Sequence, residues 1–177
     1  VTNNQIMAGR NGPGFSMNYW EAPDSILFFN SIISGNKRTD GNIGGQIFLE
    51  NWPRTAVINT LTNEIDRADS GIRLQNNIFT ENDPFVNPED ENFELADYAL
   101  AIGSGKTSVQ FYGETITAPV SDHYGNQRPL PNGSNPDLGA IENSLGERLN
   151  RSYTVKKDGT GDYLTIQEGV NGIPEGD

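Results

Sequence analysis

The chain has 177 residues, with 24 acidic against 12 basic side chains and a formal net charge of -12. This charge disfavours nucleic acid and anionic membrane surfaces as partners, because both are bound through clustered Lys and Arg. Only 34% of the residues are hydrophobic, and no apolar run approaches the roughly 20 residues of a membrane span. The absence of cysteine excludes disulfides and thiolate metal sites.

The two ends of the sequence suggest a piece of a longer or processed protein. The first residues have neither the charged start nor the apolar core of a signal peptide. The chain begins at Val1 and stops at Asp177 within a Gly-rich, acidic stretch. We therefore expect any targeting segment to lie outside this sequence.

Short apolar runs predict strands rather than helices over residues 26–79, since each run has the length of a strand. Turn-forming residues such as Ser34-Gly35-Asn36 and Asp69-Ser70-Gly71 separate them. No stretch before residue 150 has a sustained helical period, so the predicted fold class is all-β. The expected strands are Ile26 to Phe29, Ile32 to Ile33, Ile47 to Leu49, Ala56 to Ile58, Ile72 to Leu74 and Ile78 to Phe79.

An asparagine precedes several of these runs, at Asn4, Asn30, Asn59 and Asn76, with intervals of 26, 29 and 17 residues. The first two intervals suit one turn of a β-solenoid, in which each coil buries its inward side chains against neighbouring coils. Asparagine at the corners would satisfy backbone groups where the chain bends. The third interval breaks this period, and an Asn-rich antiparallel sandwich is the alternative.

An ordered series of landmarks extends from Ser31 to Glu142 over about two thirds of the chain. It includes Asp83 to Pro88, Ala99 to Gly105, Gly125 to Arg128 and Asp137-Leu138-Gly139-Ala140-Ile141-Glu142. The series resembles the C-terminal coils of right-handed parallel β-helix proteins of the pectin lyase-like superfamily, in particular the bacterial choice-of-anchor Q surface domains. This resemblance implies part of a right-handed parallel β-helix with long loops, a secreted or cell-surface location, and association with polysaccharides.

The tail has a second resemblance. Residues Tyr153 to Glu168 resemble the opening of a pectinesterase-type β-helix, where a strand and a tight turn lead into a short capping helix. Thr165 and Glu168 have the spacing of a capping box. Gly169 and Gly172 weaken such a helix by up to about 1 kcal/mol each relative to Ala, so it needs a surface to pack on. Its expected apolar face is Ile166, Val170 and Ile173.

Together the resemblances predict three parts. Residues 1–143 would end one β-helix, 144–151 would be a linker, and 152–177 would begin a second module. A solenoid that stops exposes an unpaired strand edge, which invites pairing with another chain. We therefore expect neighbouring modules as partners, or self-association in which the tail or a second copy covers an open end.

Acidic side chains concentrate over residues 81–97, and no Lys or Arg occurs from Leu74 to Gly105. Calcium prefers six to eight oxygen ligands, which makes this stretch a candidate calcium site, although its spacing fits no EF-hand. A solvated acidic loop is the alternative. The candidate ligands are Asp83, Glu89, Asp90 and Glu91.

Two aromatic residues, Trp20 and Trp52, are candidate carbohydrate contacts. Trp52 lies between Asn51 and Pro53 in an expected turn, and both rings are expected to be partly exposed, so that they could stack on a sugar. Packing in the core is the alternative role of such rings. Arg128, Asp137 and Glu142 are expected to be structural. A guanidinium there could hold a carboxylate in two parallel hydrogen bonds and lock the last coil.

The sequence favours a non-catalytic chain. His123 is the only histidine, and no activated nucleophile accompanies it, so it is interpreted as a loop residue beside Asp122. The segment Ile102 to Thr107 resembles a phosphate-binding loop, but residue 100, where the motif requires glycine, is leucine.

The predicted function is that of a non-catalytic or accessory β-helix segment of a secreted bacterial surface protein that binds carbohydrate. One alternative is a fragment of a polysaccharide lyase or carbohydrate esterase whose catalytic coils lie outside this chain. The other is a structural spacer or adhesin stalk, for which the linear stability of a solenoid is well suited.

Overall fold

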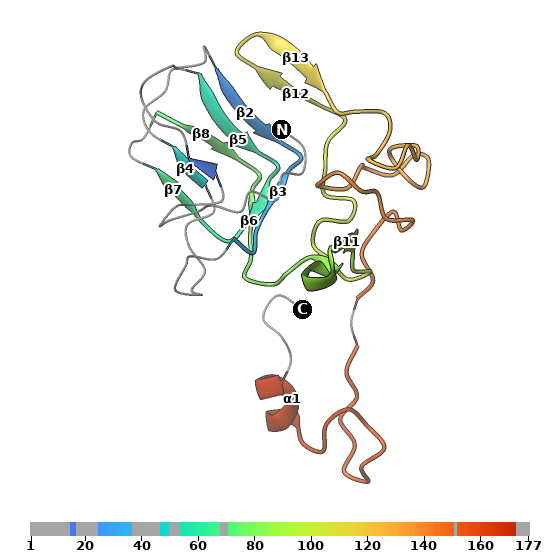
Figure 1. The fold of residues 1–177 in the computed structure, drawn as a ribbon. Helices are drawn as coiled ribbons and strands as arrows, with labels where there is room; N and C mark the ends of the chain where they lie inside the picture. The colour runs from blue at the N-terminus through green and yellow to red at the C-terminus, as the bar shows by residue number, and fades with distance from the viewer. Residues whose placement is uncertain are drawn as a thin grey trace.

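The computed structural model describes residues 15–16, 25–36, 47–49, 54–67, 71–150 and 152–172. These residues form mostly short strands, together with one 3-10 helix and one short α-helix near the C-terminus (Figure 1). The described part is therefore mainly β, as the sequence predicted. It contains no helix that is long and apolar enough to span a membrane.

The first nine strands follow one another as three triplets. The first triplet is β1 (Phe15–Ser16), β2 (Ile26–Phe29) and β3 (Ile32–Ile33). The second triplet is β4 (Ile47–Leu49), β5 (Thr55–Ile58) and β6 (Leu61–Thr62), and the third triplet is β7 (Ile65–Arg67), β8 (Arg73–Gln75) and β9 (Ile78–Phe79).

Each triplet contributes one strand to each of three sheets, whose orders are β1-β4-β7, β2-β5-β8 and β3-β6-β9. The pairing within these sheets is parallel throughout (Figure 1). The antiparallel sandwich is thus wrong for this part of the chain. Side chains in register stack in columns across the triplets, and one such column consists of Phe28, Val57 and Leu74.

Strands β2 and β5 are almost entirely apolar, and both of their faces are covered. One apolar cluster combines residues of all three sheets, among them Phe28, Ile33, Ile47 and Val57, and so lies between the sheets. Adjacent residues of β2 and β5 point the other way, where Phe29 and Ile58 pack with residues of the C-terminal half. This double burial produces continuous apolar runs rather than an alternating pattern.

An asparagine occupies the same backbone corner in each of the three triplets. The strands β2, β5 and β8 are directly followed by Asn30, Asn59 and Asn76, whose φ angles are +49°, +49° and +52°. Asparagine tolerates this left-handed conformation better than most residues, so the predicted position of asparagine at the corners is confirmed at these three residues. The predicted bonding to backbone groups is seen for Asn30, which bonds to Lys106, whereas Asn59 Nδ2 is buried without a hydrogen-bond partner in the part of the chain that the structure describes. Asn4 lies outside the described residues.

The short third interval of the repeat has a simple origin. Residues 34–46 separate β3 from β4, whereas only residues 63–64 separate β6 from β7. The triplet order persists although the connection shortens. A constant sequence period is therefore not required for the strands to stay in register.

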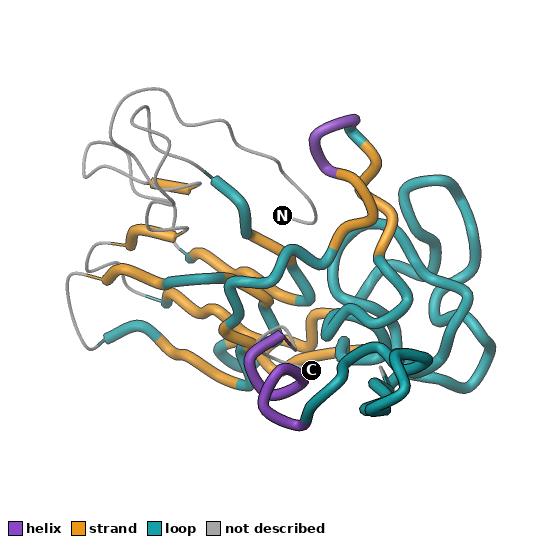
Figure 2. The backbone as a smooth tube through the Cα atoms, turned by 90° about the horizontal axis from the view of Figure 1, so that it is seen from below, coloured by secondary structure: helices purple, strands orange, loops and turns teal. Residues whose placement is uncertain are grey.

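The C-terminal half covers the sides of two sheets rather than adding strands to them (Figure 2). It contains β10 (Phe85–Asn87), the 3-10 helix η1 (Pro88–Asp90), β11 (Asn92–Leu95), and a hairpin of β12 (Ser108–Phe111) and β13 (Glu114–Thr117). The hairpin packs on the β2-β5-β8 sheet through Phe111. Leu95, Ile102 and Leu138 pack against Ile32 and Leu61 of the β3-β6-β9 sheet.

The tail folds locally. Val155 and Tyr163 form a parallel bridge, and α1 (Ile166–Gly172) follows. The predicted capping box is confirmed, since Glu168 N donates to Thr165 Oγ1 at 3.1 Å and Thr165 N donates to Glu168 Oε2 at 3.1 Å. A Cβ at Gly172 would lie 2.7 Å from the Tyr163 ring, so this glycine lets the helix contact Tyr163. Ile173 lies outside the described residues.

Candidate functional site

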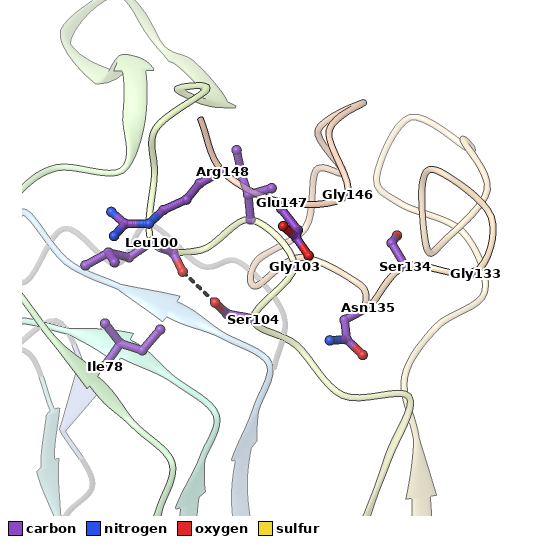
Figure 3. Close-up of a pocket in the computed structure, with 11 residues that line it drawn as sticks. Ile78, Leu100, Gly103, Ser104, Gly133, Ser134, Asn135, Gly146, Glu147 and Arg148 are labelled. Atoms are coloured by element: carbon purple, nitrogen blue, oxygen red, sulfur yellow. Dashed lines mark hydrogen bonds between the residues drawn. The ribbon is translucent and has the colours of Figure 1, made fainter. Parts of the chain in front are cut away.

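A pocket of about 580 Å³ lies between β9 and three loops of the C-terminal half (Figure 3). Its volume falls within the range of small-molecule sites in proteins. Its apolar lining is Ile78, Leu100 and Ile102, and its polar lining includes Ser104, Ser134, Asn135, Glu147 and Arg148.

Glycines bring the walls of this pocket together. A Cβ at Gly105 would lie 2.5 Å from the carbonyl oxygen of Pro136, and one at Gly103 would lie 2.5 Å from that of Gly146. Gly105 N also donates to Pro136 O at 2.8 Å. The close backbone approach needs residues without side chains at these points.

The loop that resembles a phosphate-binding motif forms part of this wall, but its amides are already used. All four backbone N–H groups of residues 103–106 donate within the protein, so the loop lacks the open cradle that binds phosphate. The acceptors are Asp137 Oδ1 for Gly103, Ala101 O for Ser104, Pro136 O for Gly105 and Asn30 Oδ1 for Lys106.

The two serine hydroxyls of the pocket donate to backbone carbonyls. Ser104 Oγ donates to Leu100 O at 2.7 Å, and Ser134 Oγ donates to Pro131 O at 2.7 Å. Both hydroxyl protons are therefore directed at carbonyls rather than at a base, while each oxygen can still accept a hydrogen bond. Figure 3 shows Arg148 on the Leu100 side of the pocket, and Ser134 and Asn135 on the opposite side.

Beside the pocket wall, Arg128, Asp137 and Glu142 form one buried polar network. Arg128 Nε lies 2.7 Å from Glu142 Oε2, and the two side chains are 3% and 0% exposed. This contact is an ion pair and not a hydrogen bond, because the Nε–H group is not directed at an acceptor. The other guanidinium nitrogens donate to Gly139 O at 2.9 Å and to Asp137 O at 2.5 Å.

The observed arrangement differs from the predicted pair of parallel hydrogen bonds between a guanidinium and one carboxylate. The two terminal nitrogens of Arg128 instead donate hydrogen bonds to backbone carbonyls. Glu142 Oε1 accepts from Leu130 N at 3.1 Å and from Asp137 N at 3.2 Å. The network thus fixes backbone segments of the last loops to one another, which is a structural role.

A further member, Asp122, was not expected from the sequence. Its carboxylate accepts from the backbone N–H of Tyr124, Asn126 and Glu142 and from the Asn126 side chain. Burial acts to raise the pKa of Asp122, but these hydrogen bonds outweigh it and lower the pKa below the ordinary value. The only sequence signal was an Asp ahead of a tight Gly turn.

Asp137 titrates differently from Asp122. It is fully buried, and burial, aided by the charge of Glu142, raises its pKa to about 6 although Gly103 N and Asn143 N both donate to it at 2.7 Å. Arg128 and these two amides act in the opposite direction. In the folded protein the carboxyl group therefore keeps a proton to a higher pH than in the unfolded chain.

This difference predicts a loss of stability as pH rises. Between the unfolded pKa of 3.8 and the folded pKa of about 6, Asp137 binds more protons in the folded state, so its contribution to the free energy of unfolding falls across that window and stays constant above it. We expect Asp137 to account for about 2–3 kcal/mol of this fall. Urea denaturation at pH 4, 5, 6 and 7 measures it. Asp137→Asn is destabilised at every pH but should show a flatter profile, and parallel profiles would contradict the assignment.

The structure does not gather the candidate calcium ligands. Asp83, Glu89, Asp90 and Glu91 are all exposed, and no group of three or more metal-ligating side chains converges in the described ranges. Asp83 Oδ1 accepts from Phe85 N at 3.1 Å, and Asp90 Oδ2 accepts from the Asn87 side chain at 2.7 Å. These hydrogen bonds shape the turns around η1.

His123, the other sequence candidate that the structure describes, does not line the pocket. Trp20 and Trp52 lie outside the described residues. His123 is exposed, with its ring 5.3 Å from that of Tyr124, and the neighbouring Asp122 carboxylate is engaged by other donors. The pocket residues themselves were missed, because they come from four separate segments of the sequence.

No family model, curated protein or solved structure matches the chain.

Proposed function

We propose that this chain is a non-catalytic, carbohydrate-binding segment of a parallel β-helix from a secreted bacterial surface protein. In this proposal a short saccharide binds in the pocket lined by Ile78, Leu100, Ser104, Asn135 and Glu147. The observation that carries the proposal is the combination, in one pocket, of an apolar floor and hydrogen-bonding groups on opposite sides.

The β-helix part of the proposal is supported by the cyclic order of the strands. Each triplet adds one strand to each sheet, in the same direction and in register. In each triplet, an asparagine corner follows the second strand. Stacking of equivalent elements is the defining property of a solenoid. Connections between parallel strands of one sheet are right-handed in nearly all proteins, which favours a right-handed helix, as in the pectin lyase-like superfamily.

The carbohydrate part follows from what a sugar requires. A saccharide presents C–H faces that pack on apolar side chains and hydroxyls that both donate and accept. Ile78 and Leu100 provide the apolar contact. Glu147 can accept from a hydroxyl, Asn135 can donate and accept, and the serine oxygens can accept. Trp20 and Trp52 remain proposed as additional stacking residues.

Calcium is proposed as an accessory ion at Asp83, Glu89, Asp90 and Glu91. Since these side chains are separate in the described structure, an ion would have to draw them together or be shared with a ligand. Binding to acidic glycans should then weaken when calcium is chelated.

The test is retention of the intact chain on immobilised plant and algal polysaccharides, with calcium and with a chelator. Glu147→Gln and Asn135→Ala should each weaken retention about tenfold, the loss expected for an unpaired polar group in a binding site. The matched controls Glu114→Gln and Asn132→Ala change exposed residues outside the pocket lining and should bind as the parent does.

Unchanged retention in both pocket variants would overturn the site. Trp20→Ala and Trp52→Ala test the two stacking residues in the same assay. Release of sugar fragments would instead favour the lyase or esterase alternative, and retention on no glycan would favour a structural spacer.

A further inference from the structure

The third triplet is the last strand set in all three sheets. β7, β8 and β9 stand at the end of their sheet orders, so among the described strands each pairs on one side only. On the other side no described strand pairs with their backbone N–H and C=O groups. Such an edge is a template for another chain.

Apolar side chains are exposed at this edge. Leu74 shares a column with Phe28 and Val57, which are 2% and 0% exposed, but is itself 37% exposed, because no further strand of the described residues follows β8 in its sheet. Phe79, on β9, is 57% exposed. We call Leu74 and Phe79, together with the free sides of β8 and β9, the third-triplet edge.

The third-triplet edge is bordered by carboxylates. Glu81 and Asp83 follow β9 directly and are exposed. Arg73, the first residue of β8, is exposed, and its guanidinium donates to Gln110 O and to the Gln75 side chain. From Leu74 to Gly105 the sequence has no further cation. A partner for the part of this edge beside Glu81 and Asp83 should therefore combine apolar side chains with positive charge.

The tail, residues 152–172, is a small folded unit that cannot bury its own apolar residues. It is held by the capping box, by the bonds from Lys156 N to Tyr163 O and from Tyr163 N to Thr154 O, and by Asp162, which accepts from Thr154. Yet Val155, Leu164, Ile166 and Val170 are 42%, 50%, 75% and 65% exposed. A seven-residue helix is too short to be stable alone, so this face needs a surface.

The charges of the tail complement those of the edge. Its only cations, Lys156 and Lys157, are exposed and directly follow Val155. The nearby carboxylates of Asp158 and Asp162 accept hydrogen bonds from Thr160 and Thr154 within the turn. The apolar residues beside lysines on the tail are thus complementary to the apolar residues beside Glu81 and Asp83 on the edge.

The tail does not cover the edge of its own molecule, since α1 lies well apart from β8 in Figure 1. We propose that the tail of one molecule binds the third-triplet edge of a second copy. Ile166 and Val170 pack on Leu74 and Phe79, and Lys156 and Lys157 lie toward Glu81 and Asp83. Because two different surfaces meet, the contact is head-to-tail and propagates into chains of molecules.

The test is the mass of the intact chain by sedimentation velocity over a wide concentration range. The parent should grow beyond a dimer as concentration rises. Ile166→Asp/Val170→Asp in the tail and Phe79→Glu at the edge should each raise the concentration needed for association at least about tenfold, since each removes apolar burial from the contact. Val120→Asp, at a residue that is 81% exposed elsewhere, is the matched control and should associate as the parent does.

A mixture of the two variants gives the sharpest result. The tail variant keeps an intact edge and the edge variant keeps an intact tail, so the mixture should form a dimer and stop there. Lys156→Glu/Lys157→Glu should weaken association, and added salt should weaken it in the parent. The proposal would be overturned if the parent stayed monomeric at every concentration. Protection of the tail from protease in that monomer would show that the tail packs on its own molecule instead. A mixture that forms no dimer would also overturn the proposal.

This inference is independent of the pocket. Glu147→Gln should associate as the parent does, and the tail variant should still bind glycan. Failure of one proposal therefore leaves the other intact.

Discussion

Replacing Arg128 by alanine is expected to lower the free energy of unfolding by about 3–5 kcal/mol, the usual result of removing one partner of a buried ion pair. The change leaves the Glu142 side chain, 0% exposed, without its cation. It also leaves the carbonyls of Gly139 and Asp137 without their guanidinium donors. Urea denaturation followed by circular dichroism measures the loss.

The double variant Arg128→Met/Glu142→Gln is the control. It removes both charges while keeping similar volume and one acceptor for the amides of Leu130 and Asp137, so it should be more stable than Arg128→Ala. Glycan retention should be unchanged in every variant that stays folded. Loss of binding without loss of stability would contradict the structural role of the network.

Replacing Phe28 by alanine is expected to destabilise the protein by about 3–5 kcal/mol, because the change opens a cavity between the sheets. Phe28 is 2% exposed and lies in a column with Val57 and Leu74. Leu74→Ala, in the same column, should cost much less, about 1 kcal/mol, since Leu74 is already partly in water.

The comparison within one column reports where the stack ends. It should be made at a concentration low enough to keep molecules apart, so that a second copy cannot cover Leu74. Equal losses at Phe28 and Leu74 under those conditions would mean that the third triplet is covered within the monomer.

The features predicted correctly from the sequence have local causes. Short apolar runs bounded by turn residues specify β2, β3, β4 and β9. The corner asparagines and the capping box of α1 depend only on backbone conformation and on residues three positions apart. Such signals do not depend on the tertiary contacts around them, so they can be recognised from the sequence alone.

The features that were missed depend on distant contacts or on weak signals. β6 (Leu61–Thr62) and β7 (Ile65–Arg67) each contain a single apolar residue beside polar ones, so no apolar run marks them. The hairpin β12–β13 turns at Tyr112-Gly113, where φ is +47° at Tyr112 and +92° at Gly113. This conformation fits a two-residue hairpin turn, but without the Asn-Gly that usually signals it. The pocket joins Ile78 to residues up to Arg148, and no spacing rule connects these segments.

The contact between Asn30 and Lys106 bears on how the chain folds. Asn30 Nδ2 donates to Lys106 O at 2.6 Å and its Oδ1 accepts from Lys106 N at 3.0 Å, across 76 residues. Asn30 O also accepts from Gly139 N at 2.9 Å. Closing such long loops precedes the gain from the contacts they allow, which slows folding. During synthesis, the face of β2 and β5 that the C-terminal half later buries therefore stays in contact with water until the hairpin and the last loops have left the ribosome.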